Sequence, residues 1–460
     1  IMKKLLLSVA ILLSVIASVY ATADQAIYST TSNGYLLKSL WFQSYNQGNL
    51  SPSMCTVENN ARSMAVTNGK VLICRRDGSA EPYALSIDIF DAATGNFIEN
   101  KALASNVFKK DDGIQVPYGC NDIRVDDAGH VLLCNLVADN KVTPLQIWNV
   151  NVADGTGTKV LEFLKGGTTG TFRFETFDVY GDITGNGYII TANGGSNTVL
   201  RWEITNGVVA STPTELTISF YPTTATTLGN ESRIHAIDSQ KFYLDGQKTY
   251  PTLYSYDNTL TSISMVSSFA DDATNKPVNT NRDGVDQFTI NGKKFVSYCN
   301  TDPSSSGVPM NFKLVELGAD MSFLGSTNYY DYPGGDGLYK TISYRWLQTV
   351  YSVVDNAGKI ASLYLYGPKN GLAAYQFGLE TDLNAISTGT STTSADQVKI
   401  TTTANGVKLS ESAKVEVFNL QGQKVAVKEN TDNVSLAAGV YIVKAIKNQK
   451  NVAIEKVIVK

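Results

Sequence analysis

Residues that commonly build metal centres and nucleic-acid surfaces are scarce in this chain. It has two histidines in 460 residues, which excludes a metal centre with three or more imidazole ligands. Charged residues make up 17% of the sequence, against about 25% in an average soluble protein. The net charge is −4 and no long basic run occurs, so the sequence does not indicate a basic surface of the kind that binds nucleic acids. No GxSxG motif is present, so a Ser-His-Asp triad cannot be argued.

Cysteine is also sparse, and its spacing does not suggest a metal site. The five cysteines include no CxxC pair, which removes the common zinc patterns. They are Cys55, Cys74, Cys120, Cys134 and Cys299. Cys74 and Cys134 each lie five residues after a turn glycine, which predicts small buried residues at equivalent positions of a repeat. One or two disulfides are the alternative in an oxidising compartment, and the odd number then leaves at least one thiol unpaired within a monomer.

Long apolar runs are absent except at the N-terminus. Lys3 and Lys4 precede an apolar run over 5–19, and Ala21-Thr22-Ala23 follows it. This order is typical of a secretory signal peptide over 1–23. The run is short for a membrane span of about 20 residues, although its retention as an anchor is an alternative. We expect a mature chain that begins at Asp24 and has no transmembrane helix.

Helical periodicity is missing as well, and short strand patterns around tight turns take its place. The segment 121–137 is the clearest example, with two strand-like stretches around Asp126-Asp127-Ala128-Gly129. Variants of this unit recur along the chain. The turn glycines are Gly69, Gly129, Gly187, Gly292 and Gly358. The interval from Gly187 to Gly292 is nearly two units long, which predicts a further turn near Ser239.

Six self-similar β units at this period predict an all-β protein with a β-propeller. The predicted first strands of the units are 63–67, 122–125, 177–179, 234–237, 285–290 and 348–354. The last unit has three strands, and a strand over 35–43 precedes the first unit. Since a ring must not leave an open edge, we expect 35–43 to complete the last blade. Six blades are favoured for 24–378, and seven would result if 329–345 formed a separate blade.

The pattern changes after the sixth unit. A linker rich in serine and threonine covers 379–396 and has little to bury. Beyond it, 397–460 contains seven short strand patterns, which predict a small Ig-like β-sandwich.

Three motifs near the C-terminus carry a resemblance to a known family. They are 415–425 (VEVFNLQGQKV), 436–444 (LAAGVYIVK) and 456–460 (KVIVK). In this order they resemble the type A sorting domain of type IX (Por) secretion. The residues that carry the motifs are Gly422, Gly439, Tyr441, Lys456 and Lys460.

The resemblance implies a protein that interacts with the type IX secretion machinery. Such cargo crosses the outer membrane after Sec export and loses the sorting domain by proteolysis. It is then released or attached to surface lipopolysaccharide, so the expected location is extracellular or the cell surface. The repeat style also resembles that of uncharacterised surface propellers carried by this system, but this likeness transfers no site residues.

Polar residues at the inner ends of the first strands form the main candidate site. They are Arg62, Asp122, Asp178, His235, Asp286 and Arg345, with Arg233 and Arg282 close by. Such a ring of mixed charge is suited to a sugar or a uronate. Two of Asp122, Asp178 and Asp286 are candidates for a general acid/base pair, because glycoside hydrolysis uses two carboxylates. The alternative is a salt-bridged plug that satisfies buried polar groups.

A candidate calcium loop lies at Asp182, Thr184 and Asn186. Oxygen side chains at alternate positions followed by Gly187 resemble the calcium loops of propeller repeats. However, Ile190 stands where those loops have an aspartate. An ordinary Asn-Gly turn between strands is the alternative.

An aromatic loop over 329–339, which contains Tyr332 and Tyr339, is a second candidate for binding. Its flat rings are suited to stacking on sugars, although packing between blades is the alternative.

Three classes of function follow from these patterns. The favoured one is a secreted, noncatalytic propeller that binds a glycan or a surface protein. The second is a glycoside hydrolase or polysaccharide lyase that uses carboxylates at the channel mouth. The third is a structural surface protein.

Overall fold

The computed structural model describes most of the chain. The described residues are 27–29, 34–44, 61–78, 81–167, 172–220, 226–230, 232–269, 284–299, 312–318, 323–330, 349–368, 371–383, 398, 400–403, 405–419, 424–447 and 450–459. They divide into two compact units, Ile1–Leu383 and Asn384–Lys460. No helix among these residues is long and apolar enough to cross a membrane.

The first unit contains six antiparallel sheets among its described residues. The first sheet consists of β3 (Ala61–Thr67), β4 (Lys70–Asp77), β5 (Ala84–Asp91) and β6 (Phe97–Ala102). The second consists of β7 (Asp122–Val125), β8 (Val131–Cys134), β9 (Leu145–Val150) and β10 (Gly157–Phe163). The third consists of β11 (Phe177–Gly181), β12 (Gly187–Ala192), β13 (Thr198–Thr205), β14 (Val208–Val209) and β15 (Thr214–Thr217).

The other three sheets follow the same plan. The fourth consists of β16 (Arg233–Ala236), β17 (Lys241–Gly246), β18 (Thr249–Tyr256) and β19 (Ile263–Ser268). The fifth consists of β20 (Val285–Ile290), β21 (Lys293–Cys299), β22 (Phe312–Leu317) and β23 (Phe323–Tyr330). The sixth consists of β24 (Thr349–Val354), β25 (Ile360–Gly367) and β26 (Gly371–Leu379), with β1 (Ile27–Ser29) and β2 (Tyr35–Ser44) added at its edge.

Tight turns between the first two strands of the sheets explain the repeat of glycines. Asn68 and Gly69 both have positive φ angles, as do Asn291 and Gly292. This combination is the one that a two-residue hairpin turn needs to match the twist of its strands. The predicted turn near Ser239 lies between β16 and β17, so the fourth unit also begins with a hairpin, but with a longer loop over 237–240 and without the Asn-Gly pair.

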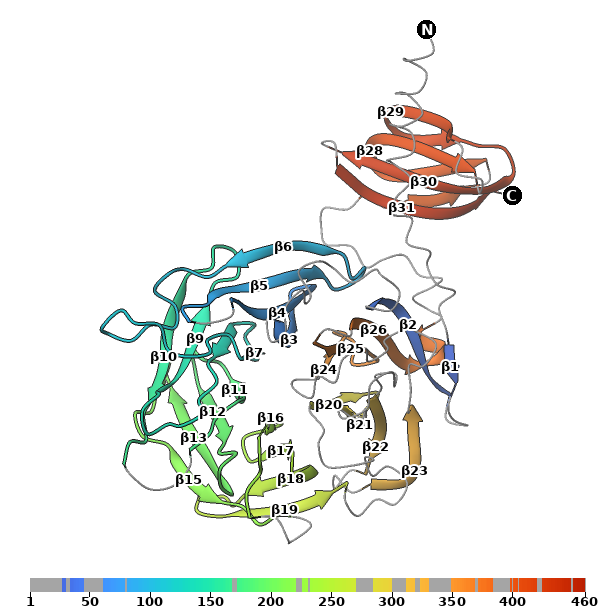
Figure 1. The fold of residues 1–460 in the computed structure, drawn as a ribbon. Helices are drawn as coiled ribbons and strands as arrows, with labels where there is room; N and C mark the ends of the chain where they lie inside the picture. Colours follow the sequence, from blue (N-terminus) through green and yellow to red (C-terminus); the bar gives the residue numbers. More distant parts are fainter. Residues whose placement is uncertain are drawn as a thin grey trace, which may run out of the picture. The chain divides into compact units, whose positions relative to one another are not determined.

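The six sheets form a closed ring, in which the first strand of each sheet lies innermost (Figure 1). Each first strand contacts the next, in the order β3, β7, β11, β16, β20 and β24, and β24 contacts β3. Every pair of neighbouring sheets also shares one buried hydrophobic cluster. The core is therefore divided into layers between sheets, as expected for a β-propeller.

The ring is closed by a strand from the start of the chain. β2 pairs with β26 along its whole length, so that Tyr35 lies opposite Leu379 and Leu37 opposite Phe377. This confirms the predicted role of 35–43. Tyr329 and Tyr330 belong to β23 in the fifth sheet, and the rest of the segment proposed as a seventh blade lies outside the described residues.

The described cysteines act as buried apolar residues. Cys74, Cys120, Cys134 and Cys299 are buried thiols outside disulfides, and burial raises the pKa of the Cys74 thiol to about 12. Cys74, Cys134 and Cys299 lie in the second strands of their sheets, in three of the hydrophobic clusters. The disulfide alternative is thus wrong for these four, and Cys55 lies outside the described residues.

The second unit has fewer and longer strands than predicted. It contains β27 (Ile400–Thr403), β28 (Gly406–Asn419), β29 (Lys424–Ser435), β30 (Gly439–Lys447) and β31 (Lys450–Val459). The predicted breaks inside β28 and β29 are shifts of register in their pairing, so the chain continues as strand across them. A single hydrophobic cluster fills this unit.

The motif residues of the second unit are partly described. Gly439 begins β30, and a Cβ atom there would lie 2.9 Å from the hydroxyl oxygen of Tyr441 and 3.1 Å from its ring, so the Tyr441 side chain packs against this glycine. Lys456 lies in β31 opposite Ile442. Gly422 and Lys460 lie outside the described residues, as do the signal segment 1–23 and most of the predicted linker. The first unit includes the start of that linker, because Leu379 pairs with β2 and Leu383 is buried.

Leu37→Ala should lower the free energy of unfolding of the first unit by about 2–5 kcal/mol, as for other large core truncations. Leu37 is 1% exposed and belongs to the cluster between the fifth and sixth sheets. Lys38→Ala on the opposite face of β2 is the matched control and should change stability by about 0.5 kcal/mol or less. Tryptophan fluorescence in urea reports this unit, because all four tryptophans lie before residue 384. Equally small effects of the two substitutions would contradict closure by β2.

Candidate functional site

The inner strands bring most of the predicted polar residues to the centre of the ring. Arg62 lies on β3, Asp122 on β7, Asp178 on β11, Arg233 and His235 on β16, and Asp286 on β20. All of these except His235 are buried. Arg282, Arg345, Tyr332 and Tyr339 lie outside the described residues. The structure separates the described group into two clusters.

The first cluster surrounds Asp122. Its carboxylate accepts hydrogen bonds from Ser63 Oγ at 2.6 Å and from Arg233 Nη1 at 2.9 Å. Arg124 Nε and the backbone N–H of Phe177 donate to the other oxygen, at 3.1 and 3.3 Å. Burial alone raises the pKa of Asp122, but the two guanidinium groups and these hydrogen bonds outweigh burial and lower it. Asp122 is therefore an ionised structural group rather than a proton donor.

Arg124 is a residue of the site that the sequence analysis missed. It lies two residues after Asp122, so both side chains point to the same face of β7. Its pKa is raised, because the charges of Asp122 and Asp178 outweigh the effect of burial. Arg62 was predicted to belong to the ring of polar residues at the inner ends of the first strands. Its guanidinium group donates a hydrogen bond to Asn121 Oδ1 at 2.9 Å, next to the Asp122 cluster. The alternation of residues along β7 was the signal that would have identified Arg124.

The second cluster consists of Asp178, His235 and Asp286. His235 Nδ1 lies 3.0 Å from Asp178 Oδ2, and Nε2 lies 3.2 Å from Asp286 Oδ1. Both ring nitrogens therefore have a carboxyl partner, and when both carboxyl groups are ionised each nitrogen must carry a proton. The carboxylates are held in turn by backbone N–H groups, with Ala236 donating to Asp178 at 2.8 Å and Ser352 donating to Asp286. The imidazolium ring thus lies between two fixed carboxylates from the neighbouring sheets.

This arrangement changes the proton affinity of two of its members. Burial lowers the pKa of His235, but the hydrogen bond to Asp178 and the charges of Asp286 and Asp178 outweigh burial and raise it. For Asp286, burial raises the pKa more than the charge of His235 and the hydrogen bonds from Ser352 lower it, so its pKa is raised. Asp286 is consequently the carboxyl group of this cluster that gains a proton more readily than usual.

A cavity of about 270 Å³ adjoins this cluster. Arg124, Asp178, His235 and Asp286 line it together with Asp127 and Tyr351. We refer to it as the ring-centre cavity. Among the described residues, a buried salt-bridged network and this cavity therefore lie next to each other at the centre of the ring.

The side-chain oxygens of Asp182 and Asn186 in the proposed calcium loop already accept hydrogen bonds from the protein. Asp182 Oδ1 accepts hydrogen bonds from the backbone N–H and the hydroxyl of Thr184, at 2.7 and 2.8 Å. Asn186 Oδ1 accepts from the backbone N–H of Asn206 at 3.0 Å. These contacts fit the alternative of an ordinary turn between β11 and β12, and the calcium site stays a prediction.

The stability of the first unit should fall as the pH rises from about 6.5 into the mildly alkaline range. An unfolded histidine has a pKa of about 6.5, and the pKa of His235 in the folded protein is higher. The contacts of protonated His235 therefore contribute fully to the stability of the folded state below about pH 6.5. The contribution is lost as the pH rises through the folded pKa, since the folded state then releases the proton. Tyr351, whose pKa burial raises, stays neutral in this range. Urea unfolding across the range should show this slope in the wild type and a flatter profile in His235→Gln, whereas identical slopes would contradict the assignment.

Solved structures with a similar arrangement include one with a TM-score above one half. It is a DUF4623 family protein from Bacteroides eggerthii, with a TM-score of 0.52, 14% sequence identity and coverage of 78% of this chain and 84% of that chain. At this identity the likeness shows a shared fold.

Two further structures match with lower scores. An α-L-arabinanase from Penicillium chrysogenum complexed with arabinobiose has a TM-score of 0.43 at 13% identity, covering 77% of this chain and 99% of that one. A GH93 α-L-arabinofuranosidase of Fusarium graminearum with arabinobiose has a TM-score of 0.42 at 12% identity, covering 70% of this chain and 93% of that one.

Comparison by sequence assigns both parts of the chain. No curated protein matches it. A family model described as a secretion system C-terminal sorting domain matches residues 394–460, which confirms the type IX sorting domain and export to the cell surface or the extracellular space. A second model, described as a domain of unknown function (DUF8500), matches residues 50–326. Because that span is more than half of the 460 residues, the chain belongs to the DUF8500 family.

Proposed function

We propose that this protein is a noncatalytic surface propeller of six blades that binds a neutral or amino sugar unit in the ring-centre cavity. The single observation that carries the proposal is the cavity beside Asp178, His235 and Asp286, whose polar groups are held in place by contacts to several sheets. The sorting domain takes the protein to a location where extracellular glycans are available. The six sheets supply the six blades.

The size and lining of the cavity support a single sugar ring as the ligand. Its volume of about 270 Å³ lies just below the range of about 300–1,000 Å³ that is usual for small-molecule pockets. Carboxylate oxygens of Asp178 and Asp286 accept hydrogen bonds from hydroxyl groups, and Tyr351 offers an aromatic surface. A longer chain would have to extend out of the cavity.

The charge of the lining favours neutral or cationic ligands over uronates. Three carboxylates, Asp127, Asp178 and Asp286, border the cavity together with Arg124 and His235. Arg124 also forms a salt bridge with the buried Asp122, so the negative charge of Asp122 offsets part of the positive charge of Arg124. An anionic sugar would meet a net negative lining, which repels it.

The position of His235 argues against a glycoside hydrolase. In these enzymes the scissile bond lies between two carboxylates, whereas here the imidazole ring lies between Asp178 and Asp286. Asp122 is held ionised by two guanidinium groups. The feature that favours an enzyme as the second candidate is Asp286, since burial raises the pKa of its carboxyl group and a general acid needs such a shift.

The final location follows from the fate of the sorting domain. We propose that it belongs to type A, that it is removed during export, and that the propeller is released or attached to surface lipopolysaccharide. The motif that contains Gly439 and Tyr441 in β30 supports this assignment. The aromatic segment with Tyr332 and Tyr339 is a further proposed contact for a glycan or a surface protein.

A polysaccharide panel tests the binding function. The full chain should be retained on at least one neutral or amino-sugar polymer and should release no reducing ends from any member. Asp178→Asn and Asp286→Asn should each weaken retention by about tenfold, the effect expected for loss of one charged hydrogen bond. Asp257→Asn, in an exposed turn of the fourth sheet, is the matched control and should bind like the wild type.

Two outcomes would overturn this proposal. Product release that disappears in Asp286→Asn would establish an enzyme instead. Absence of retention on every polymer, with the variants and the wild type alike, would favour a structural surface protein.

Removal of residues 397–460 should leave the protein in the periplasm, because the remaining chain lacks the sorting domain. Cell fractionation with an antibody against the propeller measures this distribution. A substitution in the second unit that leaves the motifs intact, such as Lys408→Ala, serves as the control and should be exported normally. Normal export of the truncated chain would refute the function of this domain.

A further inference from the structure

A cluster outside the ring-centre cavity joins the second and third sheets. Asp126 and His130 flank the turn between β7 and β8, and Asp182 lies in the equivalent turn between β11 and β12. One ligand atom from each of the three residues lies within 4.8 Å of the other two. The repeat of the hairpin therefore brings together residues that are 56 positions apart in the sequence.

The distances fit the edges of a small coordination polyhedron. His130 Nδ1 lies 2.9 Å from Asp126 Oδ2 and 3.5 Å from Asp182 Oδ1. Zinc binds nitrogen and carboxylate oxygen at about 2.0–2.2 Å in tetrahedral geometry, which places neighbouring ligand atoms about 3.4 Å apart. A cation between the three groups would consequently need only small movements of the side chains.

The backbone of both turns holds Asp126 in position. Its Oδ1 accepts hydrogen bonds from the N–H groups of Ala128 and His130, at 3.1 and 2.7 Å. Its Oδ2 accepts from the N–H of Ile183 in the next sheet at 2.8 Å. Carboxylates that bind metals are commonly oriented by such outer hydrogen bonds, and here they are made before any cation binds.

The chemistry of the three groups selects the cation. Two carboxylates converge on one imidazole nitrogen, so a positive charge between them is stabilised. Calcium takes six to eight oxygen ligands, which these residues do not supply. One imidazole and two carboxylates suit zinc, which also accepts a site with three protein ligands and one open position.

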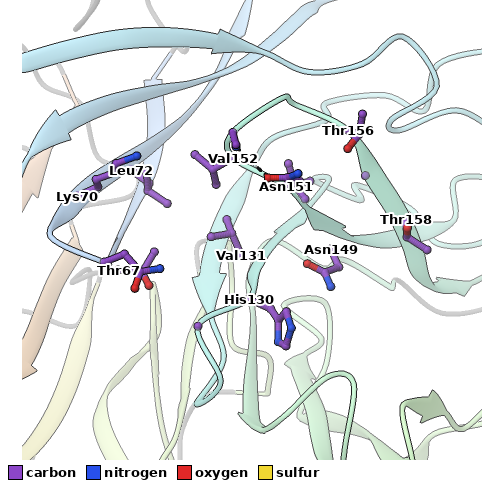
Figure 2. Close-up of a pocket in the computed structure, with 15 residues that line it drawn as sticks. Thr67, Lys70, Leu72, His130, Val131, Asn149, Asn151, Val152, Thr156 and Thr158 are labelled. Atoms are coloured by element: carbon purple, nitrogen blue, oxygen red, sulfur yellow. Dashed lines mark hydrogen bonds between the residues drawn. The ribbon is translucent and has the colours of Figure 1, made fainter.

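The site is accessible and borders a groove. The side chains of His130 and Asp182 are 33% and 39% exposed, whereas that of Asp126 is fully buried. His130 also lines a cavity of about 520 Å³ between the first and second sheets, together with Thr67, Asn149 and Thr158. Figure 2 shows His130 at the edge of this cavity, near Val131 and Asn149. Asp126 and Asp182 do not line this cavity, so a cation would reach the three groups from solvent through the partly exposed side chains of His130 and Asp182.

We propose that Asp126, His130 and Asp182 form a binding site for a zinc ion, with one coordination position open. The site shares no residue with the lining of the ring-centre cavity and does not depend on the proposed glycan function. Zinc would link the turns of two adjacent blades, in addition to the backbone hydrogen bonds that already join them.

Titration of the full chain, prepared without a histidine tag, with zinc chloride tests the proposal. Isothermal titration calorimetry should give one saturable site per chain. His130→Ala and Asp182→Asn should each weaken zinc binding at least tenfold, because each removes one of three protein ligands. Zinc should also raise the thermal midpoint of the wild type, as any ligand specific for the folded state does, and should leave that of His130→Ala unchanged.

Asp154→Asn is the matched control. Asp154 Oδ1 accepts from the N–H and the hydroxyl of Thr156, as Asp182 does from Thr184, but no histidine lies beside it among the described contacts. This variant should bind zinc like the wild type, and thermal midpoints without zinc establish that each variant is folded. Unchanged affinity in both site variants, or no saturable binding, would overturn the proposal. Calcium binding that Asp182→Asn abolishes, in the absence of zinc binding, would overturn it in favour of the calcium loop.

Discussion

Pairing between β2 and β26 is the contact on which the rest of the propeller depends. A sheet edge exposes unpaired N–H and C=O groups and attracts other strands. Here a strand from the beginning of the chain covers the edge of the sixth sheet, and the circle of six hydrophobic clusters is thereby completed. Closure also determines the site, because only in a closed ring do the first strands of all sheets converge on one centre.

Convergence of polar residues on a centre of low polarity creates a second constraint. Buried charges are tolerated only when they are paired and hydrogen-bonded. Asp122 meets this requirement with two arginines, a serine and a backbone N–H, and His235 meets it with two carboxylates. The same pairings that stabilise the ring limit its chemistry, since a carboxylate occupied by an imidazolium ion is poorly placed to accept a proton from a substrate.

Local patterns were sufficient to predict most of the architecture. The turn glycines located the hairpins, the first strands at 122–125 and 285–290 agree with β7 and β20, and the unpaired strand at 35–43 indicated closure. The strand breaks in the second unit were wrong, because polar residues within β28 and β29 are accommodated by irregular pairing rather than by turns. A single sequence does not distinguish irregular pairing within one strand from a turn between two strands, since both place polar residues next to strand residues.

By itself, the sequence determined the repeat, the closing strand, the sorting domain and several of the polar residues that reach the centre, although not Arg124. These features depend on local turn geometry, alternation along strands and short motifs, all of which act over a few residues. Only the tertiary structure decided which charges pair: Arg233 with Asp122, His235 with both Asp178 and Asp286, and His130 with Asp126 and Asp182. Most of these pairs join different blades, so their distances depend on how the sheets pack around the ring, and spacing along the chain does not encode this arrangement.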